Sequence, residues 1–206
     1  MSAVDEHIVR EYFESHGFLV CQRRKYVVQA RTKTSDEEIN LIVINPQATG
    51  AAPGEFELSA ASLAHVGRAI VAVKGWHTEV FAPSVLQHQP KIFRFVEPKA
   101  VAEASRLVGG AGLLKILVVP GLPKERAARD KSIELLRAKG VDGVISFRAI
   151  LEELVAGVAT NRNYQKSDLL QVLRLLKNYG LIKEPQLELK LKPRRKREER
   201  SGGVME

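Results

Sequence analysis

Cysteine and long hydrophobic runs are what this sequence of 206 residues has least of. A single cysteine, Cys21, excludes an internal disulfide and a zinc site built from several thiolates, and it suits a reducing compartment. We expect Cys21 to be a small, half-buried strand residue rather than a catalytic thiol. No apolar stretch approaches the ~20 residues that cross a bilayer, so the sequence predicts no membrane partner.

Metal-binding and targeting patterns are scarce as well. The five histidines show neither H-x-H nor H-E-x-x-H spacing, which argues against a zinc site. Residues 1–7 carry acidic side chains where a secretory signal carries positive charge, and we therefore expect a cytoplasmic protein. The composition is otherwise typical of a globular protein, with 45% hydrophobic and 27% charged residues.

The net charge of +8 is concentrated near the C-terminus. Residues 190–200 hold seven lysines and arginines against two glutamates. A segment of this composition cannot bury enough apolar surface to fold, so we expect residues 190–206 to form a disordered basic tail. The tail is a candidate nucleic-acid-binding segment because of one cationic run: Arg194, Arg195, Lys196 and Arg197.

A second cationic cluster interrupts a predicted strand over residues 18–29. Arg23, Arg24 and Lys25 follow one another directly, and three consecutive cations cannot all be buried. One interpretation is a patch that contacts phosphate groups. The other is a charged sheet edge that discourages aggregation, and the sequence favours neither.

Residues 68–76, R-A-I-V-A-V-K-G-W, are the stretch around which the rest of the chain is organised. The run is small and β-branched and carries no charge between Arg68 and Lys74, which predicts a strand buried on both faces. Lys74 is unusual there, because a buried ammonium needs a partner or loses its proton. On a strand alternate residues share a face, which groups four side chains: Ile70, Ala72, Lys74 and Trp76.

A second predicted strand, residues 38–45 with the sequence E-I-N-L-I-V-I-N, lies upstream and is followed by Pro46. Read together, E-I-N-L-I-V and A-V-K-G-W resemble the core of the PD-(D/E)XK nuclease superfamily, which includes restriction-endonuclease-like and Holliday-junction-resolvase-like proteins. The resemblance implies a helix, three strands, a helix and further strands. It also implies that an Asp would stand at Asn40 and a Glu at Ala72, whereas Lys74 matches the family lysine.

The two metal-binding carboxylates of that motif are therefore replaced here, and the active site is degenerate. Hydrolysis of a phosphodiester with Mg²⁺ needs carboxylates to hold the ion, and Asn40 offers only a neutral oxygen while Ala72 offers none. An active enzyme would need migrated carboxylates. The candidates are Glu38, Glu79 and Glu11. We expect no cofactor, or Mg²⁺ if the protein is active.

The order of elements predicts an α/β fold with a mixed central sheet flanked by helices, a restriction-endonuclease-like core and a C-terminal helical extension. We assign residues 1–160 to the nuclease-like domain, 161–189 to the extension and 190–206 to the tail. Ser167 is the expected N-cap of a helix with a broad apolar stripe. Further helices are expected over residues 4–16, 57–66, 84–108 in two or three pieces, 126–139 and 149–158, and further strands over 113–119 and 141–147.

Two classes of function follow from these patterns, and a third is weaker. The first is an inactive nuclease-like protein that binds nucleic acid, with DNA favoured over RNA, through Lys74, the residues 23–25 and the tail. The second is a scaffold or interaction module that keeps only the fold and contacts a protein partner, or a second copy, through the helix at 167–179. The third is an active Mg²⁺-dependent endonuclease.

Overall fold

A mixed five-stranded sheet forms the centre of the structure, a computed structural model that describes residues 2–22, 39–49, 54–109 and 112–182. Strand β2 is antiparallel to its two neighbours β1 and β3, whereas β3, β4 and β5 run parallel. Their order in the sheet is the order in the sequence: β1 (Leu19–Gln22), β2 (Leu41–Ile44), β3 (Arg68–Val73), β4 (Leu114–Val119) and β5 (Gly143–Ser146).

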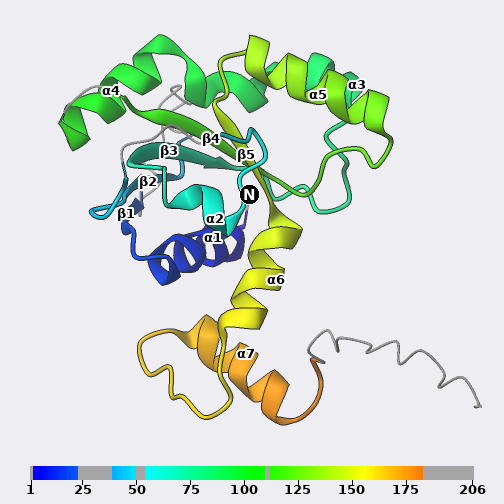
Figure 1. Ribbon diagram of the computed structural model, residues 1–206. Coiled ribbons are helices and arrows are strands. Elements are labelled where there is room, and N and C mark those ends of the chain that lie inside the picture. The colour runs from blue at the N-terminus through cyan, green and yellow to red at the C-terminus, as the bar shows by residue number, and fades with distance from the viewer. Residues whose placement is uncertain (1, 23–38, 50–53, 110–111, 183–206) are drawn as a thin grey trace, which may run out of the picture.

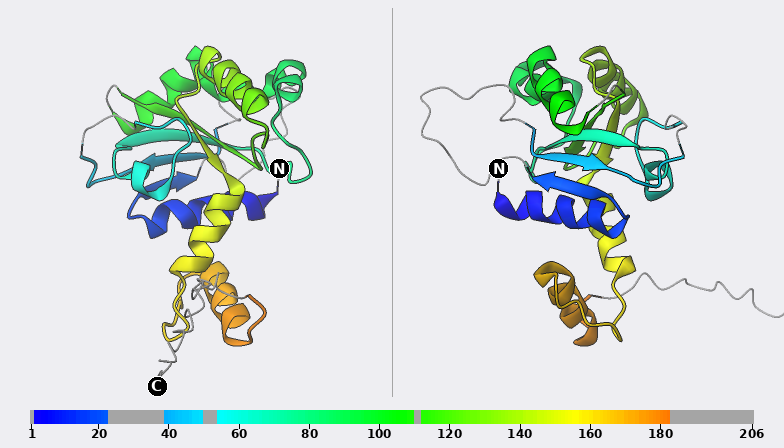
Figure 2. Two further views of the ribbon diagram at one scale, coloured as in Figure 1. Left: turned by 45° about the vertical axis from the view of Figure 1, so that its right-hand side comes forward. Right: turned by 90° about the vertical axis from the view of Figure 1, so that its left-hand side faces the viewer.

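Helices cover both faces of the sheet (Figures 1 and 2). On one face lie α1 (Ala3–Ser15) and α6 (Phe147–Gly157), which share a hydrophobic cluster with the sheet. A second cluster lies on the other face, under α3 (Pro83–His88), the 3-10 helix η2 (Pro90–Val96), α4 (Pro98–Val108) and α5 (Arg126–Ala138). The short helix α2 (Ala60–Leu63) precedes β3. The α/β fold with a mixed sheet flanked by helices is thus confirmed.

Local signals explain where several helices begin and end. Helix α1 starts at a capping box in which the Ser2 hydroxyl accepts from the Val4 N–H and the Asp5 carboxylate accepts from the Ser2 N–H. Gly17 follows the helix with φ of +82°, a conformation that favours glycine. In the predicted helical region 84–108, prolines occupy the first turns of α3, η2 and α4, which confirms the division into pieces.

Strand β3 is as deeply buried as its composition predicts, with every residue from Ala69 to Val73 shielded from solvent. The predicted extension of the strand to Trp76 is wrong, because β3 ends at Val73. The Lys74 N–H still donates to Val118 O at 2.9 Å. The chain then passes so close to α1 that a Cβ on Gly75 would overlap with the carboxylate of Asp5.

The boundaries of two other elements and the burial of one residue differ from the expectation. Phe147 is the first residue of α6 and not the last of a strand, because the Ser146 hydroxyl accepts from the Ala149 N–H as an N-cap. Residue 57 does not begin a helix, since Glu57 bridges to Val144 at the end of the sheet. Cys21 is exposed, not half-buried, because it lies on the edge strand β1 with its side chain turned away from α1.

Helix α7 (Asp168–Asn178) lies at the far end of α6, away from the sheet (Figures 1 and 2). Ser167 caps it as expected, through a hydrogen bond from the Leu170 N–H. Leu173 is buried in the cluster shared by α1 and α6, and Lys177 Nζ donates to Val158 O at 2.8 Å. Of the other residues of the predicted apolar stripe, Leu169, Leu170 and Leu176 are partly buried against the same cluster, whereas Val172, Leu175 and Tyr179 are exposed.

Among the described residues, none of the helices combines the length and the apolar character needed to cross a bilayer.

Candidate functional site

Asn40 lies one residue before β2, in the gap between helix α1 and strand β3. Its backbone N–H donates to Val71 O at 3.0 Å, and its side-chain Oδ1 accepts from the Val73 N–H at 2.7 Å. Its Nδ2 donates to Glu6 Oε1 at 2.9 Å. The residue is only 6% exposed, so these hydrogen bonds satisfy an amide that would otherwise be buried at a cost.

Glu6 extends this contact from α1 to the edge strand. Its Oε2 accepts from Gln22 Nε2 at 3.0 Å, so the carboxylate bridges β1 and the residue before β2. The sequence interpretation named Glu11 as the helical acid and missed Glu6. Helical spacing was the available signal, because Glu6 precedes the buried residues Val9 and Phe13 by three and seven positions and therefore shares their face.

Ala72 is the cross-strand neighbour of Asn40, since Leu41 pairs with Val71 in the antiparallel register. Its methyl group is fully buried in the cluster on the α3–α5 face, together with Ile70 and Leu117. The position where the resemblance implies a carboxylate is therefore a packed part of the core. Replacing that methyl group by a carboxylate would place a charge among apolar side chains.

Lys74 follows two residues after Ala72 and is 8% exposed. Trp76, two residues further, packs partly against the same cluster as Ile70 and Ala72. The alternation expected of residues 70, 72 and 76 is therefore observed, although the regular strand ends at Val73. The structure thus pairs the backbones of Asn40 and Ala72, but it directs the Asn40 amide to Glu6 on α1 and the Ala72 methyl group into the cluster on the α3–α5 face. Lys74 lies just past the end of β3.

A second acid of α1, Asp5, holds the loop that follows β3. Asp5 is 6% exposed, and its Oδ1 lies 3.1 Å from Nε2 of His77. The imidazole of His77 also meets the ring of Phe147 edge to face, at 4.7 Å between centroids. This contact ties the start of α1, the loop after β3 and the start of α6 to one another, and the sequence interpretation did not foresee it.

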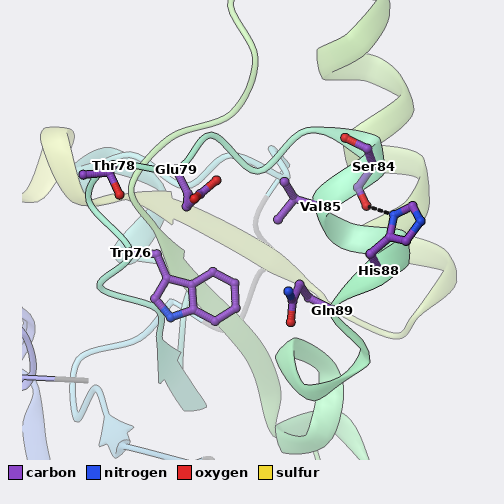
Figure 3. A pocket seen from close by; sticks show the side chains of 7 residues that line it. All are labelled: Trp76, Thr78, Glu79, Ser84, Val85, His88 and Gln89. Carbon is purple, nitrogen blue, oxygen red and sulfur yellow. Dashed lines mark hydrogen bonds between the residues drawn. The ribbon is translucent and has the colours of Figure 1, made fainter.

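The candidate metal ligands lie in different surroundings. Glu79 is exposed in the loop after β3, beside Trp76 (Figure 3). Glu11 Oε2 lies 4.0 Å from Nε2 of His7 on the same helix. Within residues 2–22, 39–49, 54–109 and 112–182, no three His, Cys, Asp or Glu side chains form a group that could hold a metal ion.

Most of the predicted cationic residues and one predicted acid lie outside the described part of the chain. These are Arg23, Arg24, Lys25, Glu38, Arg194, Arg195, Lys196 and Arg197. Their part in any site stays a prediction.

Tyr12 and Glu153 join the two helices under the sheet. The side chain of Tyr12 on α1 is fully buried. Burial is the larger cause, and the nearby carboxylate of Glu153 on α6 the smaller one, that raises the pKa of the Tyr12 phenol well above the ordinary value. His16 adds to this contact: its Nε2 lies 3.3 Å from Glu153 Oε2, and its Nδ1 lies 2.8 Å from Tyr12 O. The C-terminal half of α1 is therefore held against α6.

The fold and the site define the chain as an α/β protein with buried polar residues where α1 meets the end of β3. Comparisons with protein-family models, with curated proteins and with solved structures find no match.

Proposed function

We propose that this chain is a PD-(D/E)XK nuclease-like protein that has lost metal-dependent catalysis and binds nucleic acid through basic side chains. The order of its elements supports the proposal. Helix α1 precedes three antiparallel strands, and β4 joins β3 in parallel after the helices α3 and α4. The resemblance implies a helix, three strands, a helix and further strands, and the chain follows this order apart from the short helix α2 between β2 and β3 and the division of the helical region before β4 into several pieces.

The hydrogen bonds of the Asn40 side chain are the observation that supports the loss of metal-dependent catalysis. Where the resemblance implies a metal-binding carboxylate, the Asn40 amide donates to Glu6 and accepts from the Val73 N–H. Its oxygen is therefore occupied by the backbone, and the neighbouring Ala72 has no oxygen in its side chain. Divalent cations such as Mg²⁺ are bound in proteins chiefly through carboxylates. The two positions act as structural residues instead.

Charge supports nucleic acid as the partner. The whole chain carries +8, and Lys74 is retained where the resemblance places the lysine that meets the phosphate. Basic side chains that neutralise phosphates release counterions, which gives binding that is largely independent of sequence and weakens as salt is added.

Fluorescence anisotropy with labelled single-stranded DNA, duplex DNA and RNA tests the proposal. We expect binding that weakens by about tenfold or more between 50 and 200 mM salt. Deleting residues 190–206 should weaken it, whereas deleting only residues 201–206, which contain no basic residue, should not. An absence of binding at the lower salt would overturn the proposal. So would cleavage in Mg²⁺ or Mn²⁺ that Lys74→Ala abolishes, because it would show an active enzyme.

A second candidate function is a protein-interaction module. The observation that favours it is the exposed apolar face of α7, where Val172, Leu175 and Tyr179 lie one turn apart along the helix. Large exposed apolar patches mark interaction surfaces. Light scattering tests it with a second copy of the chain as partner: a dimer that Leu175→Ser dissociates, in a protein that binds no nucleic acid, would favour this function over the first.

A further inference from the structure

We propose that the depression beside Trp76 binds one unpaired nucleobase, with guanine as the best-matched base. The depression has a volume of about 650 Å³ and lies between the loop after β3 and helix α3 (Figure 3). Its size falls within the range of small-molecule sites. The inference rests on the proposed function in that it names how the protein would hold an unpaired base, and no part of it requires a metal.

Trp76 supplies the surface on which a base can stack. The indole is half-buried and lies 5.5 Å from the ring of Phe81, at an interplanar angle of 38°. Phe81 is fully buried, so this contact anchors the indole against the core while it also lines the depression. Unpaired bases are bound in proteins chiefly by stacking on aromatic side chains, and a base inside a duplex is not available for such a contact.

Glu79 adds a carboxylate to the lining of the same depression. Its backbone N–H donates to Trp76 O at 2.8 Å, which closes a turn and keeps the two residues together. A carboxylate accepts hydrogen bonds and donates none, and it repels phosphate. The depression therefore suits the base of a nucleotide and not its phosphate group.

The chemistry of Glu79 selects among the bases. Guanine presents two adjacent donors, N1–H and the N2 amino group, on its pairing edge, and a carboxylate can accept from both at once. Adenine and cytosine offer one amino group beside an acceptor, so only one oxygen of Glu79 would be satisfied by either of them. Uracil and thymine offer a single ring N–H between two carbonyl oxygens, which a carboxylate repels.

Gln89 lies across the depression from Glu79 and completes the polar lining (Figure 3). Its N–H donates to Val85 O at 3.1 Å, so it is held at the C-terminal end of α3. A carboxamide both donates and accepts, so Gln89 can donate to a base oxygen such as O6 of guanine. Val85 adds an apolar contact to the lining.

The chain contains one tryptophan, so its fluorescence reports directly on this depression. We expect guanosine to quench Trp76, and adenosine, cytidine and uridine to quench it more weakly at equal concentration. A short thymine oligonucleotide with one central guanine should quench more than the same strand without guanine. Glu79→Gln should weaken guanosine binding by about tenfold, which is the size expected when a charged hydrogen-bond partner is lost.

Glu134→Gln is the matched control, because it removes the same charge from an exposed position on α5. Equal affinity of both variants for guanosine, no quenching by guanosine, or equal quenching by all four nucleosides would each overturn the inference. Trp76→Phe removes the reporter, and its guanosine affinity, measured by calorimetry, should fall.

The same titrations separate the two proposals. Salt-dependent binding of oligonucleotides, seen by anisotropy without any change in Trp76 fluorescence, would overturn the base site and leave the proposed function intact. Quenching by guanosine and by the guanine-containing strand that Glu79→Gln removes, in a protein that binds neither the thymine strand nor duplex DNA at 50 mM salt, would support the base site and overturn the proposed function.

Discussion

The side-chain oxygen of Asn40 accepts a hydrogen bond from the backbone N–H of Val73 at 2.7 Å. Asn40 thereby continues the pairing of β2 with β3 one residue before the first residue of β2. Its amide nitrogen links this residue to Glu6 on α1. An aspartate at this position could accept from Val73 but could not donate to Glu6. The neutral amide is therefore the side chain that this arrangement needs.

Asn40→Asp should destabilise the protein by about 1–3 kcal/mol at pH 7, since two carboxylates would then face each other at hydrogen-bond distance. Urea unfolding measures the change. The loss should shrink at low pH, where one carboxyl of the pair is protonated, and on addition of Mn²⁺, which can bridge two carboxylates.

Glu6→Gln is the control for that charge repulsion. Combined with Asn40→Asp it restores a donor opposite the new carboxylate, so the double variant should be more stable than Asn40→Asp alone. Additive losses in the two variants would contradict the proposed contact.

Gly75→Ala should destabilise the protein by about 1–3 kcal/mol, because the added methyl group meets the carboxylate of Asp5. Gly54→Ala is the matched control, since a Cβ there meets nothing within 4 Å. Thermal unfolding of both variants gives the comparison. Adding Asp5→Ala should relieve part of the Gly75→Ala loss, and a loss of equal size at both glycines would refute the close approach.

Leu173→Ala should cost about 2–3 kcal/mol in the free energy of unfolding, because Leu173 is buried between α7 and the body. Leu175→Ala, two positions along the same helix and 43% exposed, should cost less than about 0.5 kcal/mol. Denaturant unfolding distinguishes them. Similar small effects at both positions would mean that α7 does not pack on the body in solution.

Tyr12 should make the protein less stable in alkali. Its pKa is raised in the folded state, so above the ordinary tyrosine pKa near 10 the unfolded chain releases a proton that the folded chain keeps. Stability should therefore fall as pH rises, by up to about 1.4 kcal/mol per pH unit.

Tyr12→Phe should remove the fall in the free energy of unfolding with pH that the Tyr12 phenol causes. Urea unfolding between about pH 9 and pH 11 measures this slope. Tyr179→Phe, at a tyrosine that is 78% exposed, should leave the slope unchanged. Identical slopes for the wild type and Tyr12→Phe would show that the phenol is not shielded.

Features that depend on neighbouring residues in the sequence were predicted well. The buried run 69–73, the Ser167 cap and the division of residues 84–108 into helical pieces each depend on residues only a few positions apart. Hydrophobic periodicity and capping chemistry are local properties, so a sequence displays them.

Features that depend on contact between distant segments were missed. The sequence interpretation placed neither Asp5 nor Glu6 in a contact with the sheet, yet Asp5 is buried against Gly75 and Glu6 bonds to Asn40 and Gln22. The end of β3 at Val73 has the same cause, because α1 meets the chain there.

The sequence by itself determined the α/β class and the buried central strand, because these depend on residue types and their spacing. Only the tertiary structure decided what Asn40 does, which acids of α1 face the sheet and which part of the α7 stripe stays exposed. The physical reason is that a hydrogen bond or a buried contact needs two partners, and the second partner here lies about 30 to 70 positions away along the chain.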